Sequence, residues 1–195
     1  MRKVIILMIL SLTLISCANN DYDKIINEDY KKSEVKGIKN KKEENITYYK
    51  NDYRKKLWKE DIFLILKEEN GNRKFYMGIN YKGKEWLYMS SVEFIGDDKL
   101  FIDFFDYKTF NPIWKDNTTL NMKVEEKILF PLDEKHLEVL EKIIKQKNVK
   151  VVLRSDYDDR LHMRTLGENE SIRMQEIFEL HKKLKEEKER TEDGN

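Results

Sequence analysis

The chain has 195 residues, a formal net charge of +1 and one cysteine. Charged residues make up 38% of it in nearly equal numbers of each sign, so there is no net basic field of the kind that binds nucleic acid. One cysteine allows no intramolecular disulfide, so a packed core must hold the fold. Contents of 39% hydrophobic and 11% aromatic residues argue against disorder over most of the length.

The amino terminus combines a charged start with an apolar run. Arg2 and Lys3 precede the run from Val4 to Ile15, which is followed by Ser16 and Cys17. As a helix this run would reach about 18 Å at roughly 1.5 Å per residue. Because the hydrocarbon core of a bilayer is about 30 Å thick, the run is too short to span it. The pattern is typical of a secretory signal peptide.

Leu14-Ile15-Ser16-Cys17 resembles the lipobox of bacterial lipoproteins. The resemblance implies that residues 1–16 are a cleaved signal, that the thiol of Cys17 receives a diacylglyceryl group, and that the new amino terminus is acylated. Because one acyl chain holds a protein only marginally, several chains on one residue would make a permanent anchor. The alternative is an ordinary cleaved signal with an incidental cysteine. The resemblance ends soon after Cys17 and implies an address, with no activity attached.

That address is the cell envelope, with the protein held in a membrane through the lipid on Cys17. In the lipoproteins that this signal resembles, an Asp directly after the cysteine favours the inner membrane. Ala18 stands there, so we expect the outer membrane in a cell that has one. Cleavage would remove the positive charges of Arg2 and Lys3 and move the formal charge from +1 to −1.

The remainder divides into a tether, one domain and a tail. Residues 17–45 are polar without a sustained apolar period, which predicts a lipid-anchored tether. Residues 46–188 have the length of a single domain, and residues 189–195 form a charged tail that we expect to fray. The lysines between residues 36 and 42 could touch anionic headgroups, although Glu43 and Glu44 oppose this.

The first half of the domain predicts a meander of antiparallel strands. Ile62 to Leu66 is a continuous apolar run, as a strand covered on both faces would have. Asn70-Gly71 then predicts a tight hairpin turn. We expect the following strands over residues 73–81, 86–95 and 100–105, each separated from the next by a turn.

The second half predicts one more long strand, a helix, a hairpin and a final helix. Residues 120–130 place Glu126 on an otherwise apolar strand face. Asp133 is the expected N-cap of a helix to about residue 147. Strands at 149–154 and 161–164 should pair, and Thr165 and Glu168 have capping-box spacing. The core residues expected from the two helices are Leu137, Leu140, Ile143, Ile144, Ile172, Ile177, Leu180 and Leu184.

These elements predict an α+β domain, in which an antiparallel sheet of about six to seven strands carries two C-terminal helices. A small β-sandwich with appended helices is the alternative. The motif search finds no phosphate loop, nucleophile elbow or zinc-protease motif, so no cofactor is expected. His136, His162 and His181 are scattered, and we interpret His136 and His181 as surface or boundary residues.

The densest polar cluster runs from Arg154 to Arg164. Asp156, Asp158 and Asp159 in it are candidate oxygen ligands for a hard cation. The cluster lacks the Gly and the distant Glu of an EF-hand loop, and Asp is common in turns. We therefore favour a hairpin turn with local Arg–Asp pairs and expect no metal.

Aromatic residues are concentrated between residues 76 and 114. Most belong in a core, but Phe110, Ile113 and Trp114 surround an Asn-Pro pair that predicts a loop, and they form our candidate binding surface. The favoured function is a non-enzymatic domain that binds an envelope protein or polysaccharide. The alternative is a tethered hydrolase of an envelope polymer, with carboxylates such as Asp156 and Asp158 as its acid and base.

Overall fold

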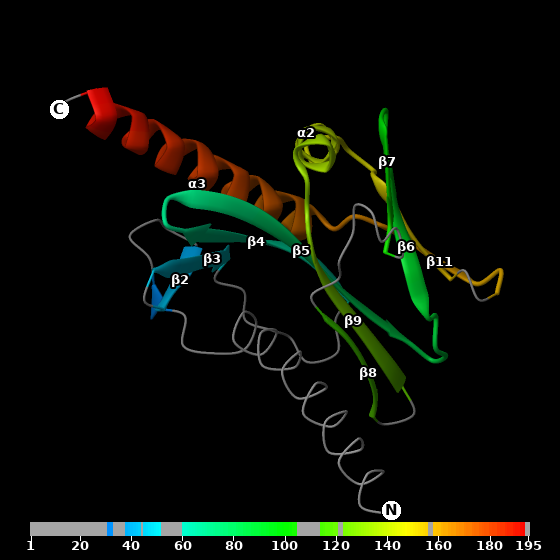
Figure 1. Ribbon diagram of the computed structural model, residues 1–195. Helices are drawn as coiled ribbons and strands as arrows, with labels where there is room; N and C mark the ends of the chain where they lie inside the picture. Colours follow the sequence, from blue (N-terminus) through cyan, green and yellow to red (C-terminus); the bar gives the residue numbers. More distant parts are fainter. Residues whose placement is uncertain are drawn as a thin grey trace, which may run out of the picture.

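The computed structural model describes residues 31–32, 38–43, 45–51, 60–104, 114–120, 123–155 and 158–193. Over these residues the strands form two antiparallel sheets with two helices packed on them, which confirms the predicted α+β class (Figure 1). Sheet A has the strand order β1-β2-β3-β4-β5-β9-β8, and sheet B has the order β11-β10-β6-β7. The strands expected in one meander are thus divided between two sheets.

The bounds of sheet A are β1 (Lys31–Lys32), β2 (Ile38–Glu43), β3 (Ile46–Asn51), β4 (Asp61–Glu69), β5 (Asn72–Gly83), β8 (Trp114–Leu120) and β9 (Lys123–Pro131). Those of sheet B are β6 (Met89–Ile95), β7 (Lys99–Asp103), β10 (Lys150–Ser155) and β11 (Leu161–Thr165). The helices are α2 (Glu134–Ile143) and α3 (Glu168–Asp193).

Strands β4 and β5 form the predicted hairpin at the centre of sheet A. Asn70 and Gly71 have φ of 51° and 78°, and Glu69 pairs with Asn72 across the turn. Positive φ at both central positions is the reason that Asn-Gly favours this turn. The continuous apolar run also behaves as predicted, because Leu64 packs into the main core while Ile65 belongs to a cluster on the opposite face.

The chain leaves sheet A after β5. The expected next strand begins at Met89, three residues later than predicted, and pairs with β10 and β7 instead of β5. Strand β9 pairs with the edge of β5 that β6 was expected to occupy, from Tyr76↔Pro131 to Gly83↔Val124. Sheet B is therefore assembled from the β6–β7 hairpin and the predicted β10–β11 hairpin.

Helix α2 begins as expected. The carboxylate of Asp133 accepts a hydrogen bond from the backbone N–H of His136 at 2.8 Å. After α2 the chain passes through Asn148, which has φ of 58°. Leu140 and Ile143 are fully buried.

Helix α3 differs from its expected start. Glu170 accepts from the N–H of Gly167 at 2.7 Å, so the cap uses these two residues and not the Thr165–Glu168 pair. The predicted core positions Ile177 and Leu180 are buried, whereas Ile172 is 46% exposed and the prediction for it is wrong.

Two boundaries also differ from the sequence division. Strands β1 and β2 lie within residues 17–45, and Ile38 is only 2% exposed in the main core, so sheet A starts before residue 46. At the other end, α3 continues to Asp193, past residue 188. Residues 1–16 and Cys17 lie outside the described residues, as do Phe110, Ile113 and Asp156.

One core joins both sheets and both helices. The ring of Phe130 of β9 packs at a tilt against that of Phe104, which follows β7, with ring centres 5.2 Å apart. Helix α3 lies along sheet A, and α2 lies between α3 and sheet B (Figure 1). Burial of each large side chain in this core stabilises the fold by roughly 1.5–3 kcal/mol, and residues of both sheets contribute to it.

Candidate binding surface

A buried carboxylate holds the segment that connects the two sheets. Glu126 of β9 is completely buried, and its Oε1 accepts from the N–H groups of Leu87 and Tyr88, the latter at 2.8 Å. Its Oε2 accepts from the N–H of Met89 at 2.8 Å. The polar residue on an otherwise apolar strand face thus accepts from three backbone donors, two of which, those of Leu87 and Met89, would otherwise be buried without partners.

This segment presents one aromatic side chain in an unfavourable backbone conformation. Tyr88 has φ of 54°, a value that residues other than Gly, Asn and Asp rarely adopt. Its side chain is 43% exposed, so packing of the ring does not account for the conformation. The hydrogen bonds that backbone N–H groups donate to Glu126 hold the segment in place, and strained backbone maintained in this way is concentrated at functional sites.

Tyr88 is the middle layer of a small stack. The Trp86 ring lies 6.3 Å from the Tyr88 ring at an interplanar angle of 28°, and the Arg160 guanidinium is 5.5 Å from the Tyr88 ring centre. Arg160 also donates to the backbone oxygen of Trp86. We call Trp86, Tyr88 and Arg160 the aromatic platform. It joins the connection between the sheets to the start of β11.

Of the three candidate aspartates of the polar cluster, the structure describes Asp158 and Asp159. Asp158 bonds Arg160 Nε at 2.5 Å, and this hydrogen bond holds the pKa of the carboxyl below its usual range. A general acid needs the opposite shift. Asp159 is exposed, and within the described ranges no group of three His, Cys, Asp or Glu side chains could hold a metal ion. The favoured turn with a local Arg–Asp pair is what the structure shows for Asp158.

The outer face of sheet B extends from the platform. One cross-strand row on it reads Phe101, Glu93, Val152 and Met163 from β7 to β11. Phe101 is 54% and Met163 50% exposed at its two ends, while Val152 is buried at its centre.

The neighbouring row places Arg154 beside Leu161, which is 52% exposed and directly follows Arg160. Arg154 Nη2 bonds Glu93 Oε2 at 2.9 Å across this face. The described chain thus leaves apolar side chains exposed around one ion pair.

His162 and Arg164 point to the other side of β11, into an ion-pair network. His162 Nε2 lies 2.9 Å from Glu60 Oε2, and Arg164 lies 3.4 Å from the same oxygen. Arg164 also makes two hydrogen bonds to Glu170, at 2.6 and 2.7 Å, and Glu170 accepts from the N–H of Ile62 at 2.8 Å. The network connects β11, β4 and α3, so its role is to hold the sheets together.

The remaining histidines have structural partners. His136 lies 2.9 Å from Asp133 at the start of α2. The His181 ring packs edge-on against Phe75, and burial lowers its pKa. Trp114 is the first residue of β8, so that part of the expected loop is a strand.

Sequence reasoning missed the platform as a unit. Trp86 and Tyr88 stood among many aromatics, and Arg160 lies more than seventy positions away in the chain. The signal that was available is Glu126, a charged residue on an apolar face.

Comparison of the chain with protein-family models, with curated proteins and with solved structures finds no match in any of the three. Among the described helices, none has both the length and the apolar character that a bilayer crossing requires.

Proposed function

We propose that this protein is a lipid-anchored lipoprotein of the cell envelope whose domain is a non-enzymatic module for binding a partner protein. The observation that carries the binding role is the aromatic platform, in which a buried carboxylate holds Tyr88 strained and exposed. Trp, Tyr and Arg are the residue types enriched where protein interfaces concentrate their binding energy. The platform consists of one of each.

The surroundings of the platform support the same function. Interfaces combine such anchors with apolar side chains and a few polar pairs that set the register. Phe101, Leu161 and Met163 supply exposed apolar surface on the adjoining sheet, and the Glu93–Arg154 pair supplies charge of both signs. The outer face of sheet B and the platform would form one continuous docking surface.

The anchor at Cys17 is supported by the lipobox alone and has its own test. Cys17→Ser should move the protein from the membrane fraction to the soluble fraction of cells, and metabolic labelling with palmitate should label the wild type only. Retention of the variant in membranes, or an unlabelled wild type, would overturn the anchor without bearing on the binding surface.

The docking surface is tested by crosslinking in intact cells. A photoreactive amino acid at position 101 should form a discrete adduct with another protein, and the same substitution at the exposed Lys135 of α2 is the control. Arg160→Ala should reduce the adduct by about tenfold or more, as loss of an interface anchor does. An adduct with a second copy of the chain would identify a dimer interface instead. Absence of an adduct at position 101, or equal adducts at both positions, would sink the proposal.

A further inference from the structure

Strand β11 is an open edge of sheet B. It pairs with β10 on one side, and no described strand pairs with it on the other. The backbone oxygen of Arg160 accepts from β10 at 3.1 Å, and the N–H of Leu166 donates to the residue before β10 at 2.8 Å. Because backbone groups alternate between the two sides of a strand, the N–H and C=O groups of Leu161, Met163 and Thr165 point away from the sheet.

The residues with these outward backbone groups also carry exposed side chains. Leu161 is 52% and Met163 50% exposed, and Thr165 is exposed as well, all on the outer face of sheet B. The backbone oxygen of Thr165 accepts from Arg164 at 3.3 Å. Within the described ranges, no hydrogen bond engages the backbone groups of Leu161 and Met163. Strand β11 thus offers main-chain donors and acceptors together with an apolar surface.

Charged residues guard the other edge of sheet B. By the same alternation, the outward residues of β7 are Lys99, Phe101 and Asp103, so a charge flanks the apolar residue on each side. Natural proteins protect strand edges from pairing with another chain by such charges, by Pro or by bulges. The outward residues of β11 include no charge and no Pro, and the β10–β11 pairing is regular. Since both strands have 5 residues, the difference lies in chemistry and not in length.

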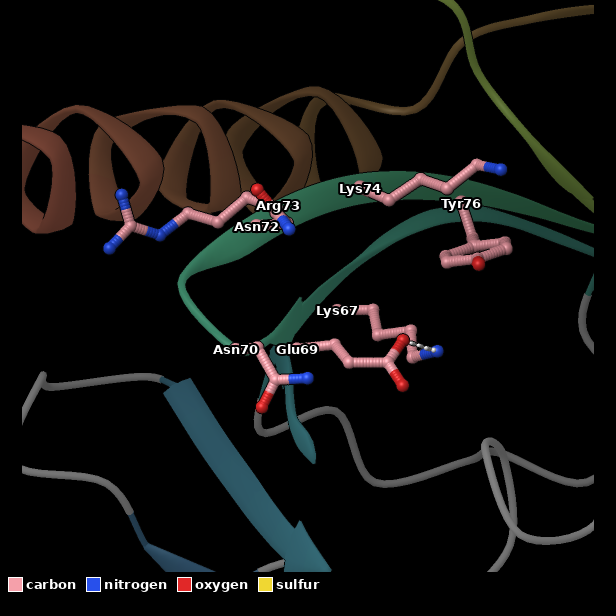
Figure 2. A pocket seen from close by; sticks show the side chains of 7 residues that line it. All are labelled: Lys67, Glu69, Asn70, Asn72, Arg73, Lys74 and Tyr76. Atoms are coloured by element: carbon pink, nitrogen blue, oxygen red, sulfur yellow. Dashed lines mark hydrogen bonds and ion pairs between the residues drawn. The ribbon is translucent and has the colours of Figure 1, made fainter. Parts of the chain in front are cut away.

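The β4–β5 end of sheet A differs from this edge. A hollow of about 360 Å³ lies there, and Figure 2 shows Lys67 and Glu69 lining it with a hydrogen bond between them. The Arg73 side chain turns the other way, toward α3, where it donates to the backbone oxygen of Leu184 at 3.0 Å. The charges of Lys67 and Arg73 are thus engaged within the domain, and β4 and β5 are interior strands of sheet A.

The aromatic platform lies at the start of β11. Arg160 directly precedes Leu161, and its guanidinium is 5.5 Å from the Tyr88 ring centre. A strand that pairs antiparallel with β11 would place one residue opposite Met163 and, two positions later, another opposite Leu161, before it continues toward the platform. Both residues would point their side chains to the outer face, because alternate residues share one face. Apolar side chains at these two positions would cover Leu161 and Met163.

We propose that an extended segment of the partner protein pairs antiparallel with β11 and adds a fifth strand to sheet B. The segment carries apolar residues at the two alternate positions opposite Met163 and Leu161. Main-chain hydrogen bonds supply affinity in this mode of recognition, and the alternate side chains supply specificity. Antiparallel pairing matches the other strand pairs of sheet B. The inference rests on the proposed binding function and names the form in which the partner meets the docking surface.

Crosslinking in intact cells tests the direction of the added strand. A photoreactive amino acid is placed at position 161 or at position 165, and mass spectrometry maps the residue of the partner to which each adduct is joined. In an antiparallel pair, the residue linked from position 161 lies about four positions C-terminal to the residue linked from position 165. The reverse order, or linked residues in separate segments of the partner, would overturn the antiparallel strand.

Proline at the centre of the edge tests the backbone contacts. Met163→Pro removes an N–H that points away from β10, so the β10–β11 hydrogen bonds are retained. The adduct from position 165 should fall about tenfold or more, because one hydrogen bond is lost and the ring obstructs the approaching strand. The matched control, Lys99→Pro, makes the same change at an outward position of β7 and should leave the adduct unchanged. Circular dichroism checks that both variants fold.

Leu161→Lys combined with Met163→Lys is the second variant, because edge lysines block strand pairing while the backbone stays the same. It should lose the adduct as Met163→Pro does. An adduct at position 101 that persists in both variants would sink strand addition and leave the docking surface intact. Ordered adducts from positions 161 and 165 without one at position 101 would support strand addition and overturn the docking surface. Adducts with a second copy of this chain would assign β11 to a dimer and contradict the partner strand.

Discussion

Sheet A buries apolar side chains on both of its faces, whereas sheet B buries one face and leaves apolar side chains exposed along both edges of the other. In sheet A, Leu64 packs into the main core and Ile65, the next residue, is equally inaccessible in a second cluster. In sheet B, Leu153 is buried on the core side, while Phe101 and Met163 on the outer side are half-exposed. Apolar residues on a second sheet face are therefore buried in a cluster of their own in one sheet and partly exposed in the other.

The largest loss of stability is expected at the connection between the two sheets, where Glu126 accepts the backbone hydrogen bonds. Glu126→Leu would leave the buried N–H groups of Leu87 and Met89 without acceptors, at a cost of about 3–5 kcal/mol in the free energy of unfolding. Urea denaturation followed by circular dichroism measures it. Glu126→Gln retains acceptor capacity and should cost less. Glu138→Gln on the exposed side of α2 is the control and should change stability by under about 0.5 kcal/mol. If Glu126→Leu costs as little stability as the control, Glu126 does not hold the connection between the sheets.

The two outer faces are compared directly by truncation to alanine. Ile65→Ala in sheet A removes a completely buried side chain and should lower the free energy of unfolding by about 2–4 kcal/mol. Met163→Ala in sheet B should lower it by less than about 0.5 kcal/mol, because half of that side chain already contacts water. Similar costs at both positions, in parallel urea titrations, would show that the outer face of sheet B is covered.

An ionisable group between sheet A and α3 makes the free energy of unfolding depend on pH. Burial, opposed by the nearby Arg173, raises the pKa of Asp61 from 3.8 to about 6. The stability contributed by this group is fully present below pH 3.8 and is lost as the pH rises through about 6, by up to about 3 kcal/mol.

Replacement of Asp61 by Asn tests that dependence, because Asn cannot ionise. The free energy of unfolding of Asp61→Asn should exceed that of the wild type by an amount that grows between pH 4 and pH 7. Glu170, whose pKa is lowered, acts in the opposite direction in both the wild type and the variant. The exposed Asp98→Asn is the control. A difference that stays constant with pH would contradict the assignment to Asp61.

Local sequence signals predicted those elements whose formation depends on neighbouring residues. The Asn70-Gly71 turn, the N-cap at Asp133 and the β10–β11 hairpin are local features, and the structure contains all three. The predicted start of α3 at Thr165 and Glu168 was wrong because Gly167 and Glu170 form the cap, and a pattern that requires Ser or Thr does not include Gly. Exposure of Ile172 was missed because helical spacing does not reveal where a packed surface ends.

The platform and the division into sheets depend on residues that are distant in the chain. Glu126 meets Leu87 across 39 positions, and Arg160 meets Trp86 across 74. Nothing in either segment specifies its partner. The edges of β5 would accept any strand of suitable pattern, so the pairing of β5 with β9 instead of β6 is decided by the side chains that fill the space between the sheets.

The sequence by itself determined the α+β class, the positions of most strands and both helices, and the lipobox pattern that predicts an anchor at Cys17. Turns, caps and the alternation of apolar residues act over a few positions, so they can be read directly along the chain. Only the tertiary structure decided that two sheets form, that Glu126 clamps the connection between them, and that Tyr88 is exposed beside Arg160. These features require close packing of distant segments, because a buried carboxylate is stable only where the completed fold supplies its hydrogen-bond donors.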